Sequence, residues 1–238
     1  MLRLDKYLAD MNQGTRSQVK ELIKAGQVTV NGQVCRTAKQ KIKDQDTVAV
    51  NGQEIGYQKF HYFMLHKPKG VLSATEDARQ KTVLDLLKPA DRYRGLAPVG
   101  RLDKDTTGLL LLTNDGQLNH ELLAPEFHVA KSYWAKIAGV ADENTVAHFQ
   151  AGICLRDGSQ LKPAKLEILK QDFDQDQSEV LVTITEGKYH QVKRMFASQG
   201  MKVTELKRLT MGTLTLDASL QPSQYRELTR QELAALGR

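Results

Sequence analysis

Apolar residues near the start of the chain recur with the period of an amphipathic helix. The spacing of Leu4, Leu8 and Met11 predicts a first helix. Residues 16–25 repeat the pattern, and Gly26 then supplies a helix stop, so we predict a second helix there.

Beyond Gly26 the apolar residues alternate with polar ones. Residues 27–35 read QVTVNGQVC, and their Asn31-Gly32 pair is a strong hairpin signal. A further strand, 47–50, ends at a second Asn-Gly pair, and residues 54–59 (EIGYQK) lose the pattern and are interpreted as a linker. The N-terminal part is therefore expected to be a small αα-β module.

The remainder of the chain is predicted to hold more strands than helices. Strands are expected at 61–65, 108–113, 131–139, 164–169, 179–185 and 202–209. Helices are expected at 116–123, 142–152, 189–200 and after Thr229, which begins a capping-box pattern. Because the two types do not alternate strictly, a mostly antiparallel sheet is favoured over a doubly wound parallel one. We predict an α+β protein with domains at 1–58 and 59–238.

Composition narrows the class of protein. The 238 residues are 40% hydrophobic and 26% charged, as in ordinary globular proteins. No apolar run approaches the ~20 residues that span a bilayer, and the charged N-terminus does not resemble a signal peptide. Two cysteines without close partners fit a reducing compartment. We therefore expect a cytoplasmic protein that acts away from membranes.

The excess positive charge belongs to one end of the chain. Residues 1–43 hold nine Lys or Arg against three acids, an excess equal to the whole net charge of +6. Arg16, Lys20 and Lys24 are four residues apart and share one helix face. A solvated stripe is the common explanation of such a run, but binding of a polyanionic partner is favoured here because the following hairpin continues the basic surface. The candidate binding residues in this part are Arg3, Lys6, Arg16, Lys20, Lys24 and Arg36.

A second candidate feature is the segment 100–116, GRLDKDTTGLLLLTNDG. It places Asp103 and Asp105 directly before an apolar strand, where a carboxylate can do chemistry if water is partly excluded and a cation lies near. A helix carrying Lys193 and Arg194 offers such a cation from elsewhere in the fold, although surface charge is the commoner role of a single Lys or Arg.

The remaining chemical signals are weaker. Tyr133 and Trp134 point to opposite faces of a predicted strand, so one ring can face a cleft and stack on a base, with core packing of both as the default. The histidines show no metal-ligand spacing, and no nucleotide-binding glycine motif occurs. Residues 103–107 fit the D-x-D-x-T pattern of magnesium-dependent phosphatases, but the apolar strand follows the motif instead of preceding it.

Four ordered segments give the chain a specific resemblance. Residues 100–116 closely resemble the signature of pseudouridine synthases of the RsuA type, which modify ribosomal RNA. Three further segments resemble the other sequence motifs of that family, in the expected order: FMLHKPKG (63–70), KSYWAKI (131–137) and EGKYHQVKRMF (186–196). Residues 1–52 resemble an S4 RNA-binding module. The resemblance thus extends along nearly the whole chain.

The resemblance implies a role for four residues. Asp103 matches the essential carboxylate, and Arg101 matches the position that helps to displace the target base. Tyr133 matches the tyrosine that packs on the extruded uracil. Lys193 matches the basic partner of the carboxylate, with Arg194 beside it as the alternative and as a further RNA-binding candidate. The family uses neither a metal nor an organic cofactor.

The implied reaction is conversion of one uridine of small-subunit 16S ribosomal RNA to pseudouridine, either in free RNA or in an assembling subunit. We expect a monomer. Two other functions stay open: a non-enzymatic S4-type RNA-binding or ribosome-assembly protein, in which Asp103 is structural, and a synthase that acts on large-subunit ribosomal RNA. The absence of a long basic tail after Arg226 favours the small-subunit target.

Overall fold

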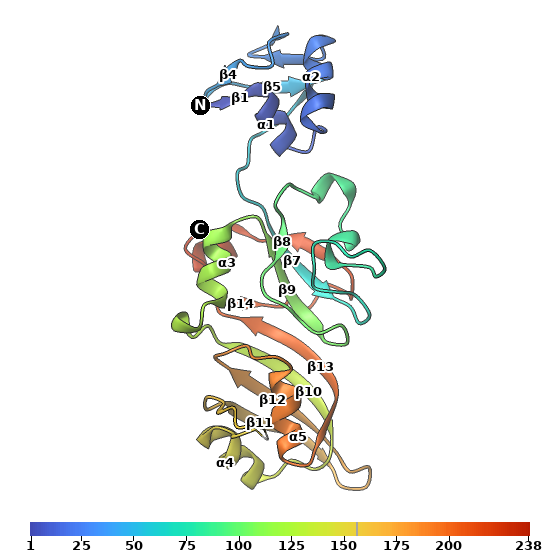
Figure 1. Ribbon diagram of the computed structural model, residues 1–238, viewed down its shortest axis with the longest axis vertical. Helices are drawn as coiled ribbons and strands as arrows, with labels where there is room; N and C mark the ends of the chain where they lie inside the picture. Colours follow the sequence, from blue (N-terminus) through green and yellow to red (C-terminus); the bar gives the residue numbers. More distant parts are fainter. Residues whose placement is uncertain (156) are drawn as a thin grey trace. The chain divides into compact units, whose positions relative to one another are not determined.

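A computed structural model describes residues 1–155 and 157–238 (Figure 1). These residues fall into two compact units. The first comprises Met1–His61 with Leu87–Leu96, and the second comprises Tyr62–Leu86 with Ala97–Arg238. The sequence-based boundary between residues 58 and 59 remains a prediction, and the grouping of Leu87–Leu96 with the first unit was not anticipated from the sequence.

Two short helices, α1 (Leu4–Asp10) and α2 (Arg16–Lys24), pack together in the first unit. Thr15 caps α2 in a complete capping box with Gln18, so two of the unpaired amides at the start of the helix are satisfied. The apolar faces predicted from the sequence are the ones that are buried: Leu4, Leu8, Val19 and Ile23 are all inaccessible to solvent.

Short strands complete the first unit. The strands are β1 (Leu2–Arg3), β2 (Val28–Val30), β3 (Gln33–Val34), β4 (Lys41–Ile42), β5 (Val48–Val50) and β6 (Gln53–Glu54). Four of them form a sheet in the order β3-β2-β5-β6, and β1 pairs with β4. Asn31 and Gly32 both have positive φ, as the tight turn of a hairpin requires.

The segment interpreted as a linker is partly built into this unit. Glu54 ends β6, and the Tyr7 hydroxyl donates to the carbonyl of Ile55 at 2.5 Å. The Tyr57 hydroxyl donates to Asp10 at 3.2 Å. Polar tethers of this kind leave no apolar periodicity, which is why the sequence pattern did not predict them.

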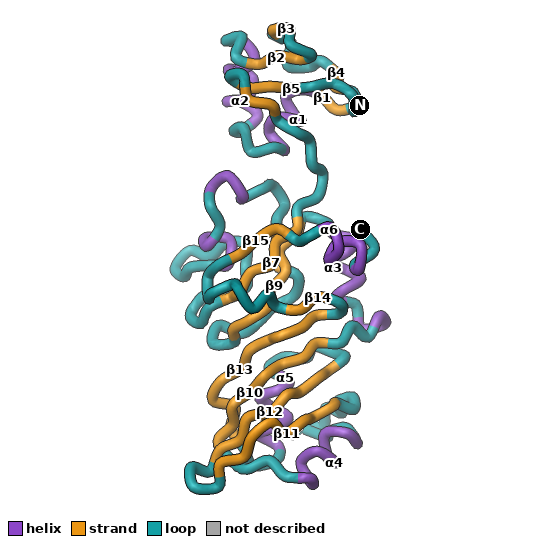
Figure 2. Tube along the Cα trace, turned by 180° about the vertical axis from the view of Figure 1, so that it is seen from behind, coloured by secondary structure: helices purple, strands orange, loops and turns teal. Residues whose placement is uncertain are grey.

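The second unit is built on one twisted sheet (Figures 1 and 2). Its strands are β7 (Tyr62–Lys67), β8 (Ala97–Pro98), β9 (Thr107–Thr113), β10 (Lys131–Ala138), β11 (Lys165–Asp172), β12 (Gln177–Ile184), β13 (Lys202–Met211), β14 (Leu214–Thr215) and β15 (Tyr225–Glu227). Their order is β11-β12-β10-β13-β9-β7-β15, with β14 beside β13 and β8 beside β9. All pairings are antiparallel except that of β13 with β9. The α+β class and the mostly antiparallel sheet are as predicted.

Strand β9 is an interior strand of this sheet, between β13 and β7. Its four leucines, Leu109–Leu112, are fully buried, because β7 and β13 flank the strand and both of its faces are covered. At its start, Gly108 lies directly opposite Arg208 of β13. A Cβ at Gly108 would lie 2.2 Å from the Arg208 carbonyl oxygen, so only glycine permits this close parallel pairing.

Among the described residues, four α-helices accompany the sheet: α3 (Gly116–Leu123), α4 (Glu143–Ala151), α5 (Gln191–Ser198) and α6 (Arg230–Ala235). Helix α5 packs on β13 and lies in front of the strands in Figure 1 and behind them in Figure 2. The rings of Phe149 in α4 and Phe196 in α5 meet at 4.8 Å between centroids. No helix in the described ranges has the length and apolar character needed to cross a bilayer.

The C-terminal helix is fastened by an ion cluster. Thr229 and Glu232 form the expected capping box at the start of α6. The Arg226 guanidinium binds Glu232 at 2.8 Å and Asp217 at 2.6 Å. The hydrogen bond from Arg226 lowers the pKa of Glu232 to about 2. This cluster joins β15, the edge strand beside β7, to the end of the chain.

Candidate active site

Asp103 lies in the loop that leads into β9. The Thr106 amide donates to the Asp103 carbonyl at 3.1 Å, which closes a tight turn. The carboxylate projects into a cavity of about 780 Å³ that is also lined by Arg101, Tyr133 and His190. Its side chain is 27% exposed, so it is neither buried in the core nor free in bulk water.

Lys67, at the end of β7, fixes this loop through hydrogen bonds to its main-chain carbonyls. Its side chain is fully buried, and its ammonium donates to the carbonyls of Asp103 and Thr106 at 3.1 and 2.9 Å. Burial lowers the pKa of Lys67 to about 8, partly opposed by the nearby Asp105 and Asp103. Ser73 adds a second clamp, because its hydroxyl accepts from the Leu102 amide and donates to the Leu102 carbonyl. The carboxylate is therefore mounted on a rigid loop.

Lys193 reaches the same carboxylate from α5. Its ammonium lies 3.0 Å from Oδ2 of Asp103 and 2.6 Å from Oδ1 of Asp105. Burial alone would lower the pKa of Lys193, but the hydrogen bonds to Asp105 and Asp103 raise it above the ordinary value. Lys193 lowers the pKa of Asp105 in turn. The site thus contains a cation that stays charged beside two carboxylates.

The neighbouring residue Arg194 takes a different partner. Its guanidinium forms an ion pair with Asp157 and not with Asp103. Of the two basic residues that the sequence left as alternatives, Lys193 is the one beside Asp103. The expected contact of Arg194 with RNA stays a prediction.

His190 also lies beside the carboxylate, although sequence reasoning did not single it out. Its Nε2 is 3.3 Å from Oδ1 of Asp103, and its ring stacks on Tyr189. The backbone of His190 adopts a left-handed conformation (φ 48) just before α5. No ligand spacing in the sequence marks this histidine, since its partner lies in a distant loop.

Tyr133 and Trp134 do face opposite sides of β10. Tyr133 is 8% exposed and lines the cavity, and its hydroxyl has no partner within the described parts of the chain. Trp134 lies on the other face, where its indole nitrogen donates to Glu179 at 3.3 Å. The tyrosine ring is therefore the one available to a base that enters the cavity.

Arg101 lies at the mouth of the cavity. It is exposed, and it makes no hydrogen bond or ion pair with any residue in 1–155 or 157–238. An uncommitted guanidinium on a clamped loop is free to contact a ligand, as its position in the sequence motif implied.

The basic residues of the first unit differ in whether they form ion pairs or hydrogen bonds within the protein. Arg16, Lys20 and Lys24 are exposed along α2, as the four-residue spacing predicted. Arg3 pairs with Asp5 and Lys6 pairs with Asp10. Arg36 donates to the carbonyl of Lys24 at 2.6 Å. The α2 face is thus the least internally neutralised part of the expected RNA-binding surface.

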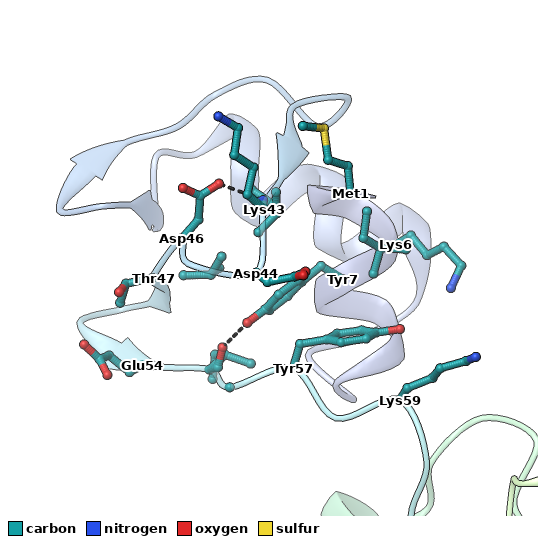
Figure 3. A pocket seen from close by; sticks show the side chains of 15 residues that line it. Met1, Lys6, Tyr7, Lys43, Asp44, Asp46, Thr47, Glu54, Tyr57 and Lys59 are labelled. Carbon is teal, nitrogen blue, oxygen red and sulfur yellow. Dashed lines mark hydrogen bonds between the residues drawn. The ribbon is translucent and has the colours of Figure 1, made fainter.

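A separate pocket of about 650 Å³ lies in the first unit (Figure 3). The rings of Tyr7 and Tyr57 lie side by side there, 5.1 Å apart between centroids, and burial raises the pKa of both hydroxyls. Positively charged lysine and negatively charged aspartate side chains line the pocket around the rings. The cations of the α2 face are not among its lining residues.

The site assignments from the sequence also did not include Lys67 and Asp105. A lysine that ends a buried strand is a recognisable signal, because a fully buried ammonium must find carbonyl or carboxylate partners. Asp105 was noted only as a second carboxylate before the strand. Within 1–155 and 157–238 no three His, Cys, Asp or Glu side chains gather as a metal site would require.

Comparison with known proteins identifies the family of this chain. The model of the RNA pseudouridylate synthase family matches residues 61–198, and that of the S4 domain matches residues 2–48. A protein of Bacillus subtilis (strain 168), named as the uncharacterized RNA pseudouridine synthase YtzG, is 47% identical over 99% of this chain and 98% of its own. The ribosomal small subunit pseudouridine synthase A of Vibrio cholerae is 42% identical, with 99% of each chain covered.

A solved structure agrees with the sequence comparisons. A crystal structure described as a pseudouridylate synthase superimposes with a TM-score of 0.67 at 39% identity, covering 99% of this chain and 100% of that one. The likeness thus extends over both units, and it includes the segments that build the cavity around Asp103. The chain belongs to the RNA pseudouridylate synthase family and carries an N-terminal S4 domain.

Proposed function

We propose that this enzyme converts one uridine of small-subunit 16S ribosomal RNA to pseudouridine, with Asp103 as the essential catalytic carboxylate. The observation that carries the proposal is that the Asp103 carboxylate and the Tyr133 ring line one cavity, with the Lys193 ammonium 3.0 Å from the carboxylate. A carboxylate mounted on a clamped loop, beside a persistent cation and an aromatic surface, suits chemistry on a nucleoside.

The uridine has to leave its stack before any side chain can reach it. Extrusion costs a few kcal/mol, and stacking on an aromatic ring returns roughly 1–3 kcal/mol per base. Tyr133 offers that ring inside the cavity. Arg101, which lines the cavity and is exposed, would occupy the space that the base vacates, a role that rests on its position in the sequence motif.

The reaction balances within one nucleotide. The bond between C1′ and N1 of uracil breaks, the ring turns, and a bond forms between C1′ and C5. The proton on C5 is lost and N1 gains one, so no oxidant, reductant or group donor is consumed. Asp103 acts at this centre as a nucleophile or as a base. Both roles require a carboxylate oxygen held close to the sugar or to the uracil ring. The turn at Asp103–Thr106 would hold the carboxylate in such a position.

Lys193 has an electrostatic role in this proposal. Its raised pKa keeps the ammonium charged at neutral pH, so it balances negative charge on the carboxylate before and after the reaction. Asp105 takes the second contact of the same ammonium and fixes its direction. Asp105 and Lys67 are therefore assigned positioning roles.

The S4 domain supports ribosomal RNA as the substrate. Exposed Arg16, Lys20 and Lys24 offer sequence-independent attraction to phosphates, which would hold the folded RNA while the catalytic unit acts. The small subunit is proposed as the target because full-length relatives carry that assignment in their names.

The test uses the full-length protein and two transcripts, 16S and large-subunit ribosomal RNA, each with tritium at C5 of uracil. Release of tritium from the 16S transcript alone is expected, because C5 loses its hydrogen when the new bond forms. Pseudouridine mapping in cells that lack the protein should then show one missing site in 16S RNA. Release from the large-subunit transcript alone would point to the other target. Binding without release from either would favour a non-enzymatic role.

A further inference from the structure

Two buried cations on the floor of the cavity have no carboxylate partner. Lys131 is 7% exposed and Arg208 is 2% exposed. Lysine and arginine side chains are almost never buried to this extent without a pair. Neither residue forms an ion pair in the described parts of the chain, and neither takes part in the chemistry assigned to Asp103 and Lys193.

Their hydrogen bonds leave most of their donors unused. The Lys131 ammonium donates to the carbonyl of Val129 at 2.9 Å, and the Nε of Arg208 donates to the carbonyl of Leu109 at 2.8 Å. The Nη2 of Arg208 is buried and has no partner among the described residues. Such a group carries a desolvation cost until an acceptor reaches it.

The fold places Lys131 and Arg208 together in the wall of one cavity. Tyr133 and Arg208 are direct cross-strand partners on β10 and β13, and Lys131 lies two residues before Tyr133 on the same buried face of β10. All three line the cavity that contains Asp103. The close pairing of Gly108 with Arg208 fixes the strand that carries the guanidinium.

The two charges also act on each other. Burial lowers the pKa of Lys131, and the charge of Arg208 lowers it further. An anion placed against both would relieve the desolvation and the repulsion together. Two cations near Asp103 are less suited to this role, because Lys193 is held by two carboxylates and Lys188 contacts Glu186 at 3.8 Å. Arg101 is exposed and therefore carries no comparable desolvation cost.

We propose that Lys131 and Arg208 form an anion site that binds a backbone phosphate adjacent to the uridine stacked on Tyr133. The chemistry of the ligand follows from the site: uracil is neutral, whereas two unpaired cations match the negative charge of a phosphodiester. The site would hold the strand at a fixed distance from the Asp103 carboxylate and so place the sugar of the target nucleotide. Its identity as an RNA phosphate site depends on the proposed function.

The first test is independent of that function. Inorganic phosphate, titrated at constant ionic strength, is expected to raise the melting temperature of the wild-type protein, because a ligand that binds the folded state stabilises it. The Lys131→Met variant should lose most of this shift. Lys136→Met, on the other face of the same strand, should keep it. Equal shifts in wild type and Lys131→Met would overturn the anion site.

The second test locates the phosphate. A substrate RNA receives a neutral methylphosphonate at the linkage before or after the target uridine. One of the two changes should raise KM for the wild-type enzyme about tenfold or more, with little change in kcat, because a charge-assisted contact is lost. In the Lys131→Met and Arg208→Lys variants, the neutral linkage should raise KM much less, because the cation that contacts the phosphate is already absent or displaced.

The outcomes separate the two proposals. Wild-type turnover of unmodified RNA tests the proposed function, and the response to the neutral linkage tests the phosphate contact. A wild-type enzyme that is indifferent to both neutral linkages would contradict the contact even if turnover is normal. A Lys131→Met variant that keeps the full wild-type sensitivity would contradict it equally, while a phosphate-dependent melting shift without turnover would retain the anion site and refute the reaction.

Discussion

The ammonium of Lys193 lies 3.0 Å from the carboxylate of Asp103. One residue sits on helix α5 and the other in the loop before β9, and the two elements meet because β13, which follows α5, pairs in parallel with β9. Asp105 receives the same ammonium at 2.6 Å, so the cation is held by two contacts and has little freedom to turn away. The sheet thus brings the two residues of the proposed catalytic pair together.

Replacing Lys193 by Met should lower kcat by about 100-fold or more, because one preorganised electrostatic partner of the reacting group is removed. Lys193→Arg should keep a larger share of the activity, since it preserves the charge. The measurement is single-turnover pseudouridine formation, with circular dichroism to establish that the variants fold.

Arg194→Met is the matched control for this change. It removes a cation from the adjacent position of α5, but its partner is Asp157. Turnover should stay within a few-fold of wild type. If Arg194→Met abolished turnover and Lys193→Met spared it, the assignment of the basic partner would be wrong.

Tyr133→Leu should weaken productive binding of the extruded base. Loss of a stacking ring costs roughly 1–3 kcal/mol, which corresponds to about a 5- to 150-fold fall in kcat/KM. Tyr133→Phe keeps the ring and should keep the affinity of the enzyme for RNA. Trp134→Leu changes the next residue on the opposite face of β10 and should leave kcat/KM near wild type. Equal losses in Tyr133→Leu and Trp134→Leu would indicate damage to the strand instead of lost stacking.

The α2 face should dominate the salt dependence of RNA binding. Replacing Arg16, Lys20 and Lys24 together by Gln should reduce the slope of log K against log salt by about 2–3, because three phosphate contacts are lost. A triple replacement of Lys39, Lys41 and Lys43 removes the same charge from the same unit and serves as control. If both triple variants reduce the slope equally, the attraction is a property of net charge and not of this helix face.

The C-terminal ion cluster should make stability sensitive to acid. Glu232 has a pKa near 2 in the folded protein, below its ordinary value of 4.5, because Arg226 donates to it. Its stabilising effect is therefore fully present above about pH 4.5 and is lost as the pH falls toward 2. Glu232→Gln should be less stable than wild type at neutral pH and should show a shallower fall in the free energy of unfolding between pH 4.5 and 2. Urea denaturation at several pH values measures this slope, and parallel curves for the two proteins would show that the cluster contributes nothing.

The regular elements of this fold could be predicted because their patterns are local. The residues of helix α3 were predicted with its observed bounds, 116–123, since an aspartate cap and an Asn-Asp-Gly turn precede its apolar face. The burial of strand β10 alternates strictly along its whole length, and β9 carries the continuous apolar run Leu109–Leu112 because it is an interior strand. Short pairings such as β1 with β4 have no periodicity to detect, and they depend on contacts between distant segments.

The candidate site divides along the same line. Asp103 and Tyr133 could be singled out because the segments around them carry recognisable patterns, and the faces of Tyr133 and Trp134 follow from strand geometry. The resemblance assigned Lys193 as the basic partner, with Arg194 as the alternative. The helical pattern alone could not separate the two, because neighbouring helix residues point about 100° apart and the bounds of a helix are uncertain by one or two residues. His190 and Arg208 act through partners far away in the chain, so their positions required the sheet topology.

The most direct test of the central claim is pseudouridine formation by Asp103→Asn. The substitution preserves size and removes the charge, so the turn at residues 103–106, which is built from main-chain atoms and the buried Lys67, should persist. We predict wild-type folding, RNA affinity within a few-fold of wild type, and no detectable pseudouridine under single-turnover conditions with excess enzyme. Pseudouridine formation by the Asn variant at a rate near that of wild type would contradict the account.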